Sequence, residues 1–319
     1  MTAHLDTVLA PRGEDDITIS TSDGRFLGPG VSDNGAGLAA LLALAGAWNS
    51  APPQSGGLAP VLIANVGEEG EGNLSGMRFL CRAANHARPL AFLVLDGPNT
   101  DHITCRALAS RRFEVIVGGP GGHSWSDHGT ANPVHAISRA ITAFTDSVPA
   151  GSVPKSSFNF GLVRGGNSIN SIPSEARAKV DLRSEDAARI DQLAALLETS
   201  VEQAVEVENA RATSGRVSAK VKEIGSRPGG VLAEGSAILE AIRAVDVFLK
   251  IRSSLDCAST DANIPLSMGL PAVSIGAGGQ GGGAHTPAEW FHPEGREVGL
   301  RRILLALCLL LADGEKEMR

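Results

Sequence analysis

The sequence predicts an α/β protein that carries an inserted ferredoxin-like α+β domain. Two observations lead to this fold. Short apolar runs that resemble buried strands alternate with helical patterns in the first and last parts of the chain. Between about residues 109 and 224 the order becomes strand, helix, strand, strand, helix, strand, which is that of a ferredoxin-like sandwich. We therefore expect an outer domain in two parts (1–108 and 225–319) and an inserted domain (109–224).

The outer domain is predicted from short apolar runs and from amphipathic segments. A loop or hairpin with its turn at Ser22–Arg25 precedes an Ala/Leu-rich helix that ends near Trp48. Pro60–Ala64 and Leu90–Leu95 are short continuous apolar runs, as expected for buried strands. The other expected elements are a helix from Ser75 to about Asn85, a helix over 234–249, a strand over 271–276 and a closing helix over 293–311.

The inserted domain is predicted from residue periods of 2 and 3.6. Arg111–Val117 alternates in the manner of a half-exposed strand. A helix over 132–148 brings apolar side chains to one face, namely Ile137, Ile141 and Phe144. A helix over 186–206 does the same with Ile190, Leu193, Leu197, Val201 and Val205. The remaining strands are expected over 156–163, 175–182 and 217–224.

Composition limits the classes of function. The 319 residues suffice for two domains, and 43% hydrophobic with 20% charged residues is ordinary for a globular protein. The net charge of −7 argues against nucleic acid as a partner. The four cysteines are far apart, so we expect reduced thiols in a cytoplasmic protein. No signal peptide is recognisable, and the apolar run 304–311 is too short to span a bilayer, so no membrane partner is expected.

Two adjacent glutamates, Glu68 and Glu69, are the first candidate site. Glycines at 67, 70 and 72 break any helix, so both glutamates lie on the loop that follows the strand Pro60–Ala64. Ligands of open α/β sheets bind at the carboxyl ends of strands. Two adjacent carboxylates repel each other unless a cation or a proton separates their roles. One could bind a metal while the other moves protons; an acidic surface turn is the alternative.

Five more acidic or histidine residues lie at strand ends or near glycine-rich loops. His4 and Asp6 point the same way on a strand end, so His4 could bind a metal while Asp6 supports it and fixes its tautomer. Asp33 precedes a helix, either as an N-cap or as a carboxylate aimed into the site. Asp96 ends an apolar strand, and His285 follows a glycine-rich segment. Mixed His and carboxylate ligands suit zinc, manganese or cobalt better than calcium.

Eight short motifs, spread over nearly the whole chain, together resemble those of one family. They are His4-Leu5-Asp6, Ser32-Asp33-Asn34-Gly35, Gly67-Glu68-Glu69, Leu95-Asp96-Gly97, Gly121-Gly122-His123-Ser124, Asn170-Ser171-Ile172-Pro173, Asp181-Leu182-Arg183 and Gly283-Ala284-His285-Thr286. The family is that of the dimetal amidohydrolases aminoacylase, carboxypeptidase G, peptidase T and succinyl-diaminopimelate desuccinylase. The resemblance implies a mixed-sheet zinc-peptidase catalytic domain with an inserted lid and dimerisation domain.

The resemblance also implies a metal centre with two divalent ions, zinc first and manganese or cobalt as alternatives. His4 and Asp96 would hold one ion, and Glu69 and His285 the other. Asp33 would bridge the two, with a cis peptide bond to the next residue.

The remaining roles follow from the same resemblance. Glu68 would be the general base, with Asp6 supporting the ligands. His123 would reach the active site of a partner subunit and stabilise the oxyanion. Asn170 and Arg183 would bind the substrate, with Arg183 on its carboxylate.

The expected function is hydrolysis of an amide bond in small peptides, as in a di- or tripeptide aminopeptidase. A water between two cations loses a proton near neutral pH, and Glu68 would accept that proton and deliver it to the leaving amine. A deacylase or carbamoylase of N-substituted amino acids would use the same residues. A lidless dizinc aminopeptidase is disfavoured by the insertion. A non-catalytic dimeric remnant is a further alternative.

The start of the chain differs from the family pattern. Family members usually carry a helix and a strand before the His-x-Asp motif, whereas three residues precede His4 here. We therefore expect the strand that places His4 to be missing or reduced to a stub, so that His4 dangles and one metal site is weakened.

Overall fold

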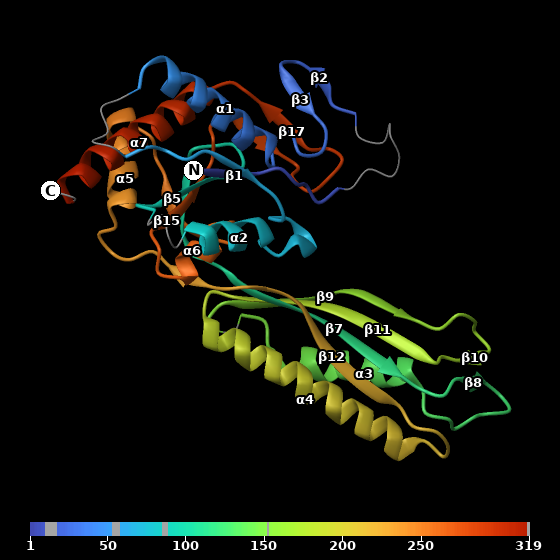
Figure 1. Cartoon of the computed structure of the whole chain (residues 1–319). Coiled ribbons are helices and arrows are strands. Elements are labelled where there is room, and N and C mark those ends of the chain that lie inside the picture. Colours follow the sequence, from blue (N-terminus) through green and yellow to red (C-terminus); the bar gives the residue numbers. More distant parts are fainter. Residues whose placement is uncertain (10–17, 53–57, 85–88, 152, 318–319) are drawn as a thin grey trace. The chain divides into compact units, whose positions relative to one another are not determined.

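The chain forms two compact units in the computed structural model (Figure 1). The first unit comprises Met1–Ala107 with Gly230–Arg319, and the second comprises Leu108–Gly229. The structure describes residues 1–9, 18–52, 58–84, 89–151 and 153–317. The division into domains at residues 108 and 224 stays a prediction.

A seven-stranded mixed sheet forms the centre of the first unit, which confirms the expected α/β class. Four strands run parallel: β15 (Ala272–Ile275), β5 (Phe92–Leu95), β1 (Thr2–His4) and β4 (Ile63–Asn65). Beyond β15, strand β6 (His102–Ala107) is antiparallel to β15 and pairs with β14 (Ser254–Ala258) and β13 (Gly230–Val231). Because the four parallel strands point the same way, their carboxyl ends lie along one edge.

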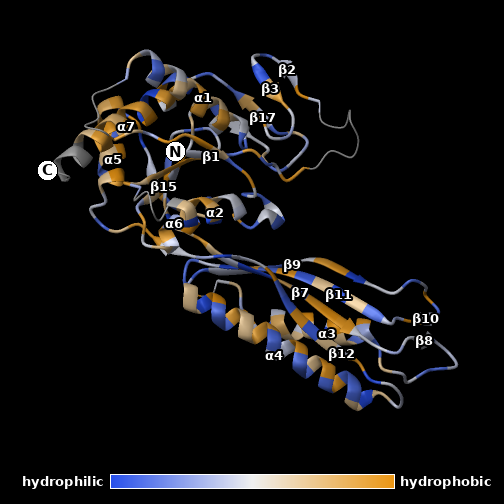
Figure 2. Ribbon diagram, in the orientation of Figure 1, coloured by the Kyte–Doolittle hydropathy of each residue, from blue (hydrophilic) through white to orange (hydrophobic). Residues whose placement is uncertain are grey.

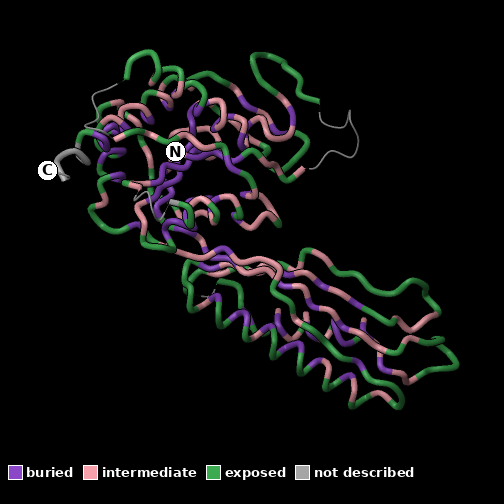
Figure 3. The backbone as a smooth tube through the Cα atoms, in the orientation of Figure 1, coloured by how far each residue is buried: buried purple, intermediate pink, exposed green. Residues whose placement is uncertain are grey.

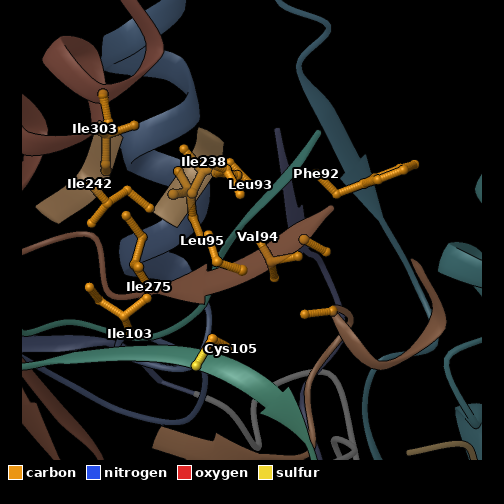
Figure 4. Packing of buried hydrophobic residues seen from close by; sticks show 14 of the residues in the cluster. Phe92, Leu93, Val94, Leu95, Ile103, Cys105, Ile238, Ile242, Ile275 and Ile303 are labelled. Atoms are coloured by element: carbon orange, nitrogen blue, oxygen red, sulfur yellow. The ribbon is translucent and has the colours of Figure 1, made fainter. Parts of the chain in front are cut away.

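Helices pack on this sheet through apolar side chains. The helices of the first unit are α1 (Gly35–Ser50), α2 (Ser75–Ala84), α5 (Ala237–Leu249), α6 (Asn263–Ser267) and α7 (Arg296–Glu317). Ile238 and Ile242 of α5 and Ile303 of α7 belong to one buried apolar cluster with Leu93 and Leu95 of β5 (Figure 4). All five side chains are almost completely buried, because the four-residue spacing in α5 and the two-residue spacing in β5 each bring apolar groups to one face.

A small antiparallel sheet joins two distant parts of the chain. Its order is β16 (Gln280–Gly282), β17 (Trp290–His292), β3 (Arg25–Leu27) and β2 (Ser20–Ser22). The expected hairpin turn is confirmed, since Asp23 and Gly24 both have positive φ between the paired residues Ser22 and Arg25. In this sheet, the segment that follows His285 in the chain lies beside the segment that precedes Asp33. Residues 10–17 of the expected loop lie outside the described residues.

The second unit confirms the ferredoxin-like order. Its antiparallel sheet has the order β12 (Ser218–Arg227), β7 (Ala109–Gly118), β11 (Glu175–Ser184) and β9 (Ser156–Gly165). Helices α3 (Pro133–Ser147) and α4 (Ala187–Arg211) pack on β7 and β11. The hydropathy of α4 alternates along the helix, so that an apolar stripe faces the sheet (Figure 2). A short sheet of β8 (Gly122–His123) and β10 (Ser171–Ile172) extends this unit.

The expectation that His4 dangles is wrong. Strand β1 is only three residues long, but it lies between β4 and β5 and pairs with both. His4 is 1% exposed, and the strand is buried throughout (Figure 3). Two parallel neighbours hold this short strand in place. Among the described residues, no helix is both long and apolar enough to cross a membrane.

Candidate metal centre

Ligand candidates meet where three parallel strands end. His4 is the last residue of β1, and Asp96 directly follows β5. Glu68 and Glu69 lie on the loop between β4 and a short 3-10 helix, η1 (Gly70–Gly72). Because these strands lie side by side in the sheet, their ends bring the four side chains together, as the sequence predicts for an open α/β sheet.

Asp33 reaches the same edge from the start of helix α1. The next residue, Asn34, is the N-cap, and its side-chain oxygen accepts hydrogen bonds from Gly37 N at 3.1 Å and Gly97 N at 3.2 Å. Its amide nitrogen donates to the carbonyl of Leu95 at 2.8 Å. The cap therefore ties the helix to the end of β5. The expected cis peptide bond between Asp33 and Asn34 is present.

The carboxylate of Asp33 lies between two histidines, with one oxygen toward each. Its Oδ1 is 3.0 Å from Nε2 of His4, which is also 3.8 Å from the carboxylate of Asp96. Its Oδ2 is 3.1 Å from Nε2 of His285, which is also 3.1 Å from the carboxylate of Glu69. Two groups of three ligands, His4–Asp33–Asp96 and Asp33–Glu69–His285, thus share one carboxylate.

In the first group, His4–Asp33–Asp96, two atoms are placed to bind a cation rather than to bind each other. Nε2 of His4 and Oδ1 of Asp33 are both buried and without a hydrogen-bond partner among the described residues, although they are 3.0 Å apart. Nδ1 of His4 donates to the carbonyl of Asp6, so in the neutral ring the lone pair of Nε2 faces Oδ1 of Asp33, and the two atoms repel each other unless a proton or a cation lies between them. A shared divalent cation would satisfy both, and a donor set of imidazole and carboxylate suits such an ion.

The charge balance of the centre also favours a cation. Burial lowers the pKa of His4, but the carboxylates of Asp33 and Asp96 outweigh burial and raise the pKa to about 12. Burial and the charge of Asp33 raise the pKa of Glu69. The cluster thus holds more negative charge than its surroundings compensate, and either protons or metal ions neutralise it.

Asp6 organises the loop that carries the two glutamates. Its carboxylate accepts hydrogen bonds from the main-chain nitrogens of Gly67 at 2.8 Å, Glu68 at 3.3 Å and Glu69 at 2.8 Å. We expected this carboxylate to orient His4, but Nδ1 of His4 hydrogen-bonds the main-chain carbonyl of Asp6 at 2.9 Å and is 3.8 Å from the carboxylate. The carboxylate points to the loop because three N–H groups converge on it there.

Glu289 holds the loop that carries Asp33 in the same way, and the sequence did not predict this role. Its carboxylate, 1% exposed, accepts hydrogen bonds from the main-chain nitrogens of Gly30 at 2.8 Å, Ser32 at 2.8 Å and Asp33 at 2.7 Å. The only signal available was an acidic residue between Ala288 and the apolar pair that follows it in the chain.

Asp261, to which no role could be given from the sequence, is buried close to the centre. It is 0% exposed, and Nδ2 of Asn65 donates to its Oδ2 at 2.7 Å. Asn65 ends β4 and pairs with His4 of β1. Burial raises the pKa of Asp261 to about 6. Asp261 therefore joins α6 and its preceding turn to the strand ends beneath the ligands.

With this arrangement in view, comparison with known proteins is decisive. The family model "Peptidase family M20/M25/M40" matches residues 1–308. The chain belongs to this peptidase family.

Relatives of known name in the M20/M25/M40 family include two bacterial succinyl-diaminopimelate desuccinylases. The enzyme of Bradyrhizobium diazoefficiens is 30% identical over 212 residues, which are 62% of this chain and 53% of that protein. The enzyme of Rhodopseudomonas palustris (strain BisB18) is 26% identical over 235 residues, which are 70% of this chain and 58% of that protein. The chain thus spans about half the length of the curated relatives it matches.

Solved structures of the family share the fold. Aminopeptidase PepT from Bacillus cereus has a TM-score of 0.70 at 20% identity, covering 98% of this chain and 80% of that one. The dipeptidase Dug1p from Saccharomyces cerevisiae has a TM-score of 0.71 at 15% identity, covering 98% and 79%. At these identities the likeness shows the fold alone.

The M20/M25/M40 motif residues of the second unit fall into two places. His123 and Asn170 lie together, since Ser124 N donates to the carbonyl of Asn170 at 3.0 Å and β8 pairs with β10. Nδ1 of His123 accepts hydrogen bonds from Trp125 N and Ser126 N at 3.2 and 3.3 Å. A neutral imidazole with an acceptor at Nδ1 carries its proton on Nε2, so the exposed ring can donate from that atom.

Arg183 lies in β11 of the four-stranded sheet, at the end remote from β8 and β10. It pairs in register with Ser110, whereas Glu175, eight residues earlier in β11, pairs with Gly118 next to the β8 segment. Eight strand residues span roughly 26 Å. Nε of Arg183 donates to Asp181 at 2.6 Å, which orients the guanidinium. One copy of the second unit therefore does not bring Arg183 and His123 to the same substrate.

Proposed function

We propose that this protein hydrolyses an amide bond in small peptides with the help of two divalent metal ions, zinc first and manganese or cobalt as alternatives. The observation that carries the proposal is the sharing of Asp33 between two groups of three ligands. His4, Asp33 and Asp96 would hold one ion, and Asp33, Glu69 and His285 the other. Two-metal hydrolases place their ions about 3.5–4 Å apart on such a shared carboxylate.

Glu68 is the proposed general base. It is 5% exposed, lies next to the ligand Glu69, and offers a carboxylate oxygen within 4.8 Å of Nε2 or Nδ1 of His4 and an oxygen of Glu69. When bound, the two ions would polarise the scissile carbonyl and make a water molecule between them more acidic. Glu68 accepts the proton of the attacking water and gives it to the leaving amine. Asp6 keeps Glu68 in place through the loop main chain.

His123, Asn170 and Arg183 are the proposed substrate-binding residues. Nε2–H of His123 donates to the oxyanion, and Arg183 binds a free carboxylate of the substrate. Since Arg183 lies at the end of its sheet that is remote from the β8 segment with His123, we infer that His123 and Asn170 act in the site of a partner subunit, so that a homodimer formed through the second unit completes two sites. We also infer a cytoplasmic location from the four free cysteines.

A second candidate function is hydrolysis of an N-acyl amino acid. The names of the relatives favour it, because the matching bacterial proteins are desuccinylases, whereas the peptidases among the solved structures are less than 25% identical. Both reactions use the same metal ligands and Glu68. The complete set of ligands argues against a non-catalytic remnant.

The test combines metal content with one substitution. We expect close to two zinc, manganese or cobalt ions per chain by elemental analysis, and turnover of at least one substrate in a panel of di- and tripeptides and N-acyl amino acids. Glu68→Ala should keep both ions and lose turnover by about 10²–10⁴-fold. Glu240→Gln, an exposed carboxylate of α5, is the matched control and should change neither. Fewer than two ions, or near-normal turnover in Glu68→Ala, contradicts the proposal.

A further inference from the structure

A polar cavity of about 560 Å³ adjoins the metal centre in the first unit. Asp96 lines this cavity and is also a ligand candidate, so the two spaces share a wall. Strands β6, β14 and β15 contribute most of the other lining residues. No apolar run in the sequence predicts β6 or β14, so the cavity between them is not predicted either.

Two buried residues with hydroxyl groups form the floor of the cavity. Thr104 of β6 and Ser274 of β15 face each other in register and are 2% and 1% exposed. Within the part of the chain that the structure describes, no hydrogen bond of either hydroxyl is found, and neither oxygen is among the atoms that are sealed off without a partner, so both open into the cavity. A ligand in the cavity that donates hydrogen bonds can therefore reach both hydroxyls.

Strand register places carboxylates on both sides of these hydroxyls. Asp256 of β14 is opposite Thr104, and Ser274 is opposite Val94, two residues before Asp96. Residues opposite each other and residues two apart share a face of a sheet. Asp256, the two hydroxyls and Asp96 therefore form a row across four strands, which spans about 14 Å.

The rim of the cavity is acidic. Asp101 lies there with its Oδ1 3.1 Å from Nδ1 of His102, and Asp256 is exposed. One oxygen of Asp256 accepts a hydrogen bond from Cys257 N at 2.7 Å; among the described residues its other oxygen has no partner. None of the described residues that line the cavity is lysine or arginine. The cavity thus offers carboxylates and hydroxyls as acceptors; among its described lining residues His102 is the one basic group, and it pairs with Asp101, so no basic lining residue pairs with Asp256.

We propose that this cavity is a subsite for a cationic group of the substrate, an ammonium or a guanidinium at the end of a side chain. The proposal rests on the amide hydrolysis proposed above, because it assumes that the scissile bond lies at the metal centre beside Asp96. A long side chain that leaves this point along the row brings its terminal N–H groups to the hydroxyls of Ser274 and Thr104, which accept them. The carboxylate of Asp256, opposite Thr104, lies beyond them and attracts the positive charge.

Pairs of ligands that differ only by a terminal ammonium group test the subsite separately from turnover. Binding is measured by calorimetry to the zinc-loaded Glu68→Ala protein with three pairs: Ala-Lys and Ala-norleucine, Lys-Ala and norleucine-Ala, and Nα-acetyl-lysine and Nα-acetyl-norleucine. For at least one pair we expect the lysine member to bind about ten-fold or more tightly, as one charge-assisted hydrogen bond suggests. Adding Asp256→Asn and Asp101→Asn should remove most of this difference, and Glu240→Gln should not.

The possible results are distinct from those of the proposed function. Equal affinity within every pair, no binding of any lysine member, or a preference that survives both Asp→Asn substitutions overturns the subsite. Thr104→Val is a second variant, which removes one hydroxyl from the floor without changing charge and should weaken the lysine member alone. Turnover of uncharged substrates by the wild-type protein, together with one of these negative results, would leave the proposed hydrolysis intact and reject only the cationic subsite.

Discussion

Glu289 accepts a hydrogen bond of 2.7 Å from the main-chain nitrogen of Asp33, although 256 residues separate them in the chain. Glu289 lies four residues after His285, so one short segment supplies a ligand candidate and also fixes the loop that carries Asp33. Asp6, two residues after His4, fixes the loop of Glu68 and Glu69. Two loops at the candidate metal centre are thus each held by a carboxylate that accepts three main-chain N–H groups.

Glu289→Ala should weaken metal binding at the Asp33 centre. The substitution leaves three N–H groups without their acceptor, and loss of support behind a ligand typically costs 10–100-fold in metal affinity. The measurement is a calorimetric zinc titration of the metal-free protein. Glu294→Gln is the control, because Glu294 is 76% exposed and lies five residues away. Unchanged zinc affinity in Glu289→Ala would contradict the role.

Asp6→Ala should reduce turnover more than it reduces metal content. It frees the main chain of Gly67, Glu68 and Glu69, whereas His4 keeps its hydrogen bond to the carbonyl of residue 6. We expect kcat to fall by about 10–100-fold, with zinc still bound at His4. Asp23→Asn, in the exposed β2–β3 turn, is the control. A normal kcat in Asp6→Ala would show that the loop holds its shape without this carboxylate.

The sequence predicts the candidate site residues better than the residues that support them. His4, Glu68, Glu69 and Asp96 could be placed because each ends or follows an apolar run, and parallel strands bring such ends together. The support by Glu289 depends on the pairing of β17 with β3, a contact between distant segments that no local pattern records.

The missed strands have a similar explanation. Strand β6 contains His102, Thr104 and Arg106 on one face, and β14 lies at the edge of the sheet, so neither is a continuous apolar run. Their polar faces form the cavity next to Asp96. The second unit, by contrast, alternates regularly, and its four main strands and two helices could be predicted with small errors at their ends.

Breaking the buried ion pair of Asp246 and Arg302 should strongly lower the stability of the folded protein. Both guanidinium–carboxylate hydrogen bonds are 2.6 Å long, and the residues are 5% and 0% exposed between α5 and α7. Asp246→Asn leaves a buried arginine without its counter-charge and should lower the free energy of unfolding by about 3–5 kcal/mol. Urea unfolding measures this. Glu175→Gln, which breaks the exposed pair with Arg177, should leave the free energy of unfolding nearly unchanged.

Replacing both members of the buried pair is the informative second variant. Asp246→Leu with Arg302→Met removes both charges and keeps apolar volume between the helices, so stability should recover to near the wild-type value. If the double variant is as unstable as Asp246→Asn, packing around α5 and α7 matters more than the unpaired charge.

Asp261 should make the metal-free protein less stable as pH rises. Burial raises the pKa of Asp261 from 3.8 to about 6 in the folded state, so the folded protein retains a proton that the unfolded chain releases. This contribution is complete below about pH 4 and is lost as pH rises through 6. Above pH 7 the buried charge costs on the order of 3 kcal/mol.

The variant Asp261→Asn tests this, because it keeps an oxygen for Asn65 Nδ2 and carries no charge. In urea unfolding, the Asp261→Asn variant should therefore be more stable than the wild type at pH 8 and nearly as stable as the wild type at pH 4. The control Asp23→Asn should show no such dependence on pH. If the variant and the wild type were equally stable at both pH values, Asp261 would be ionised without cost in the folded protein.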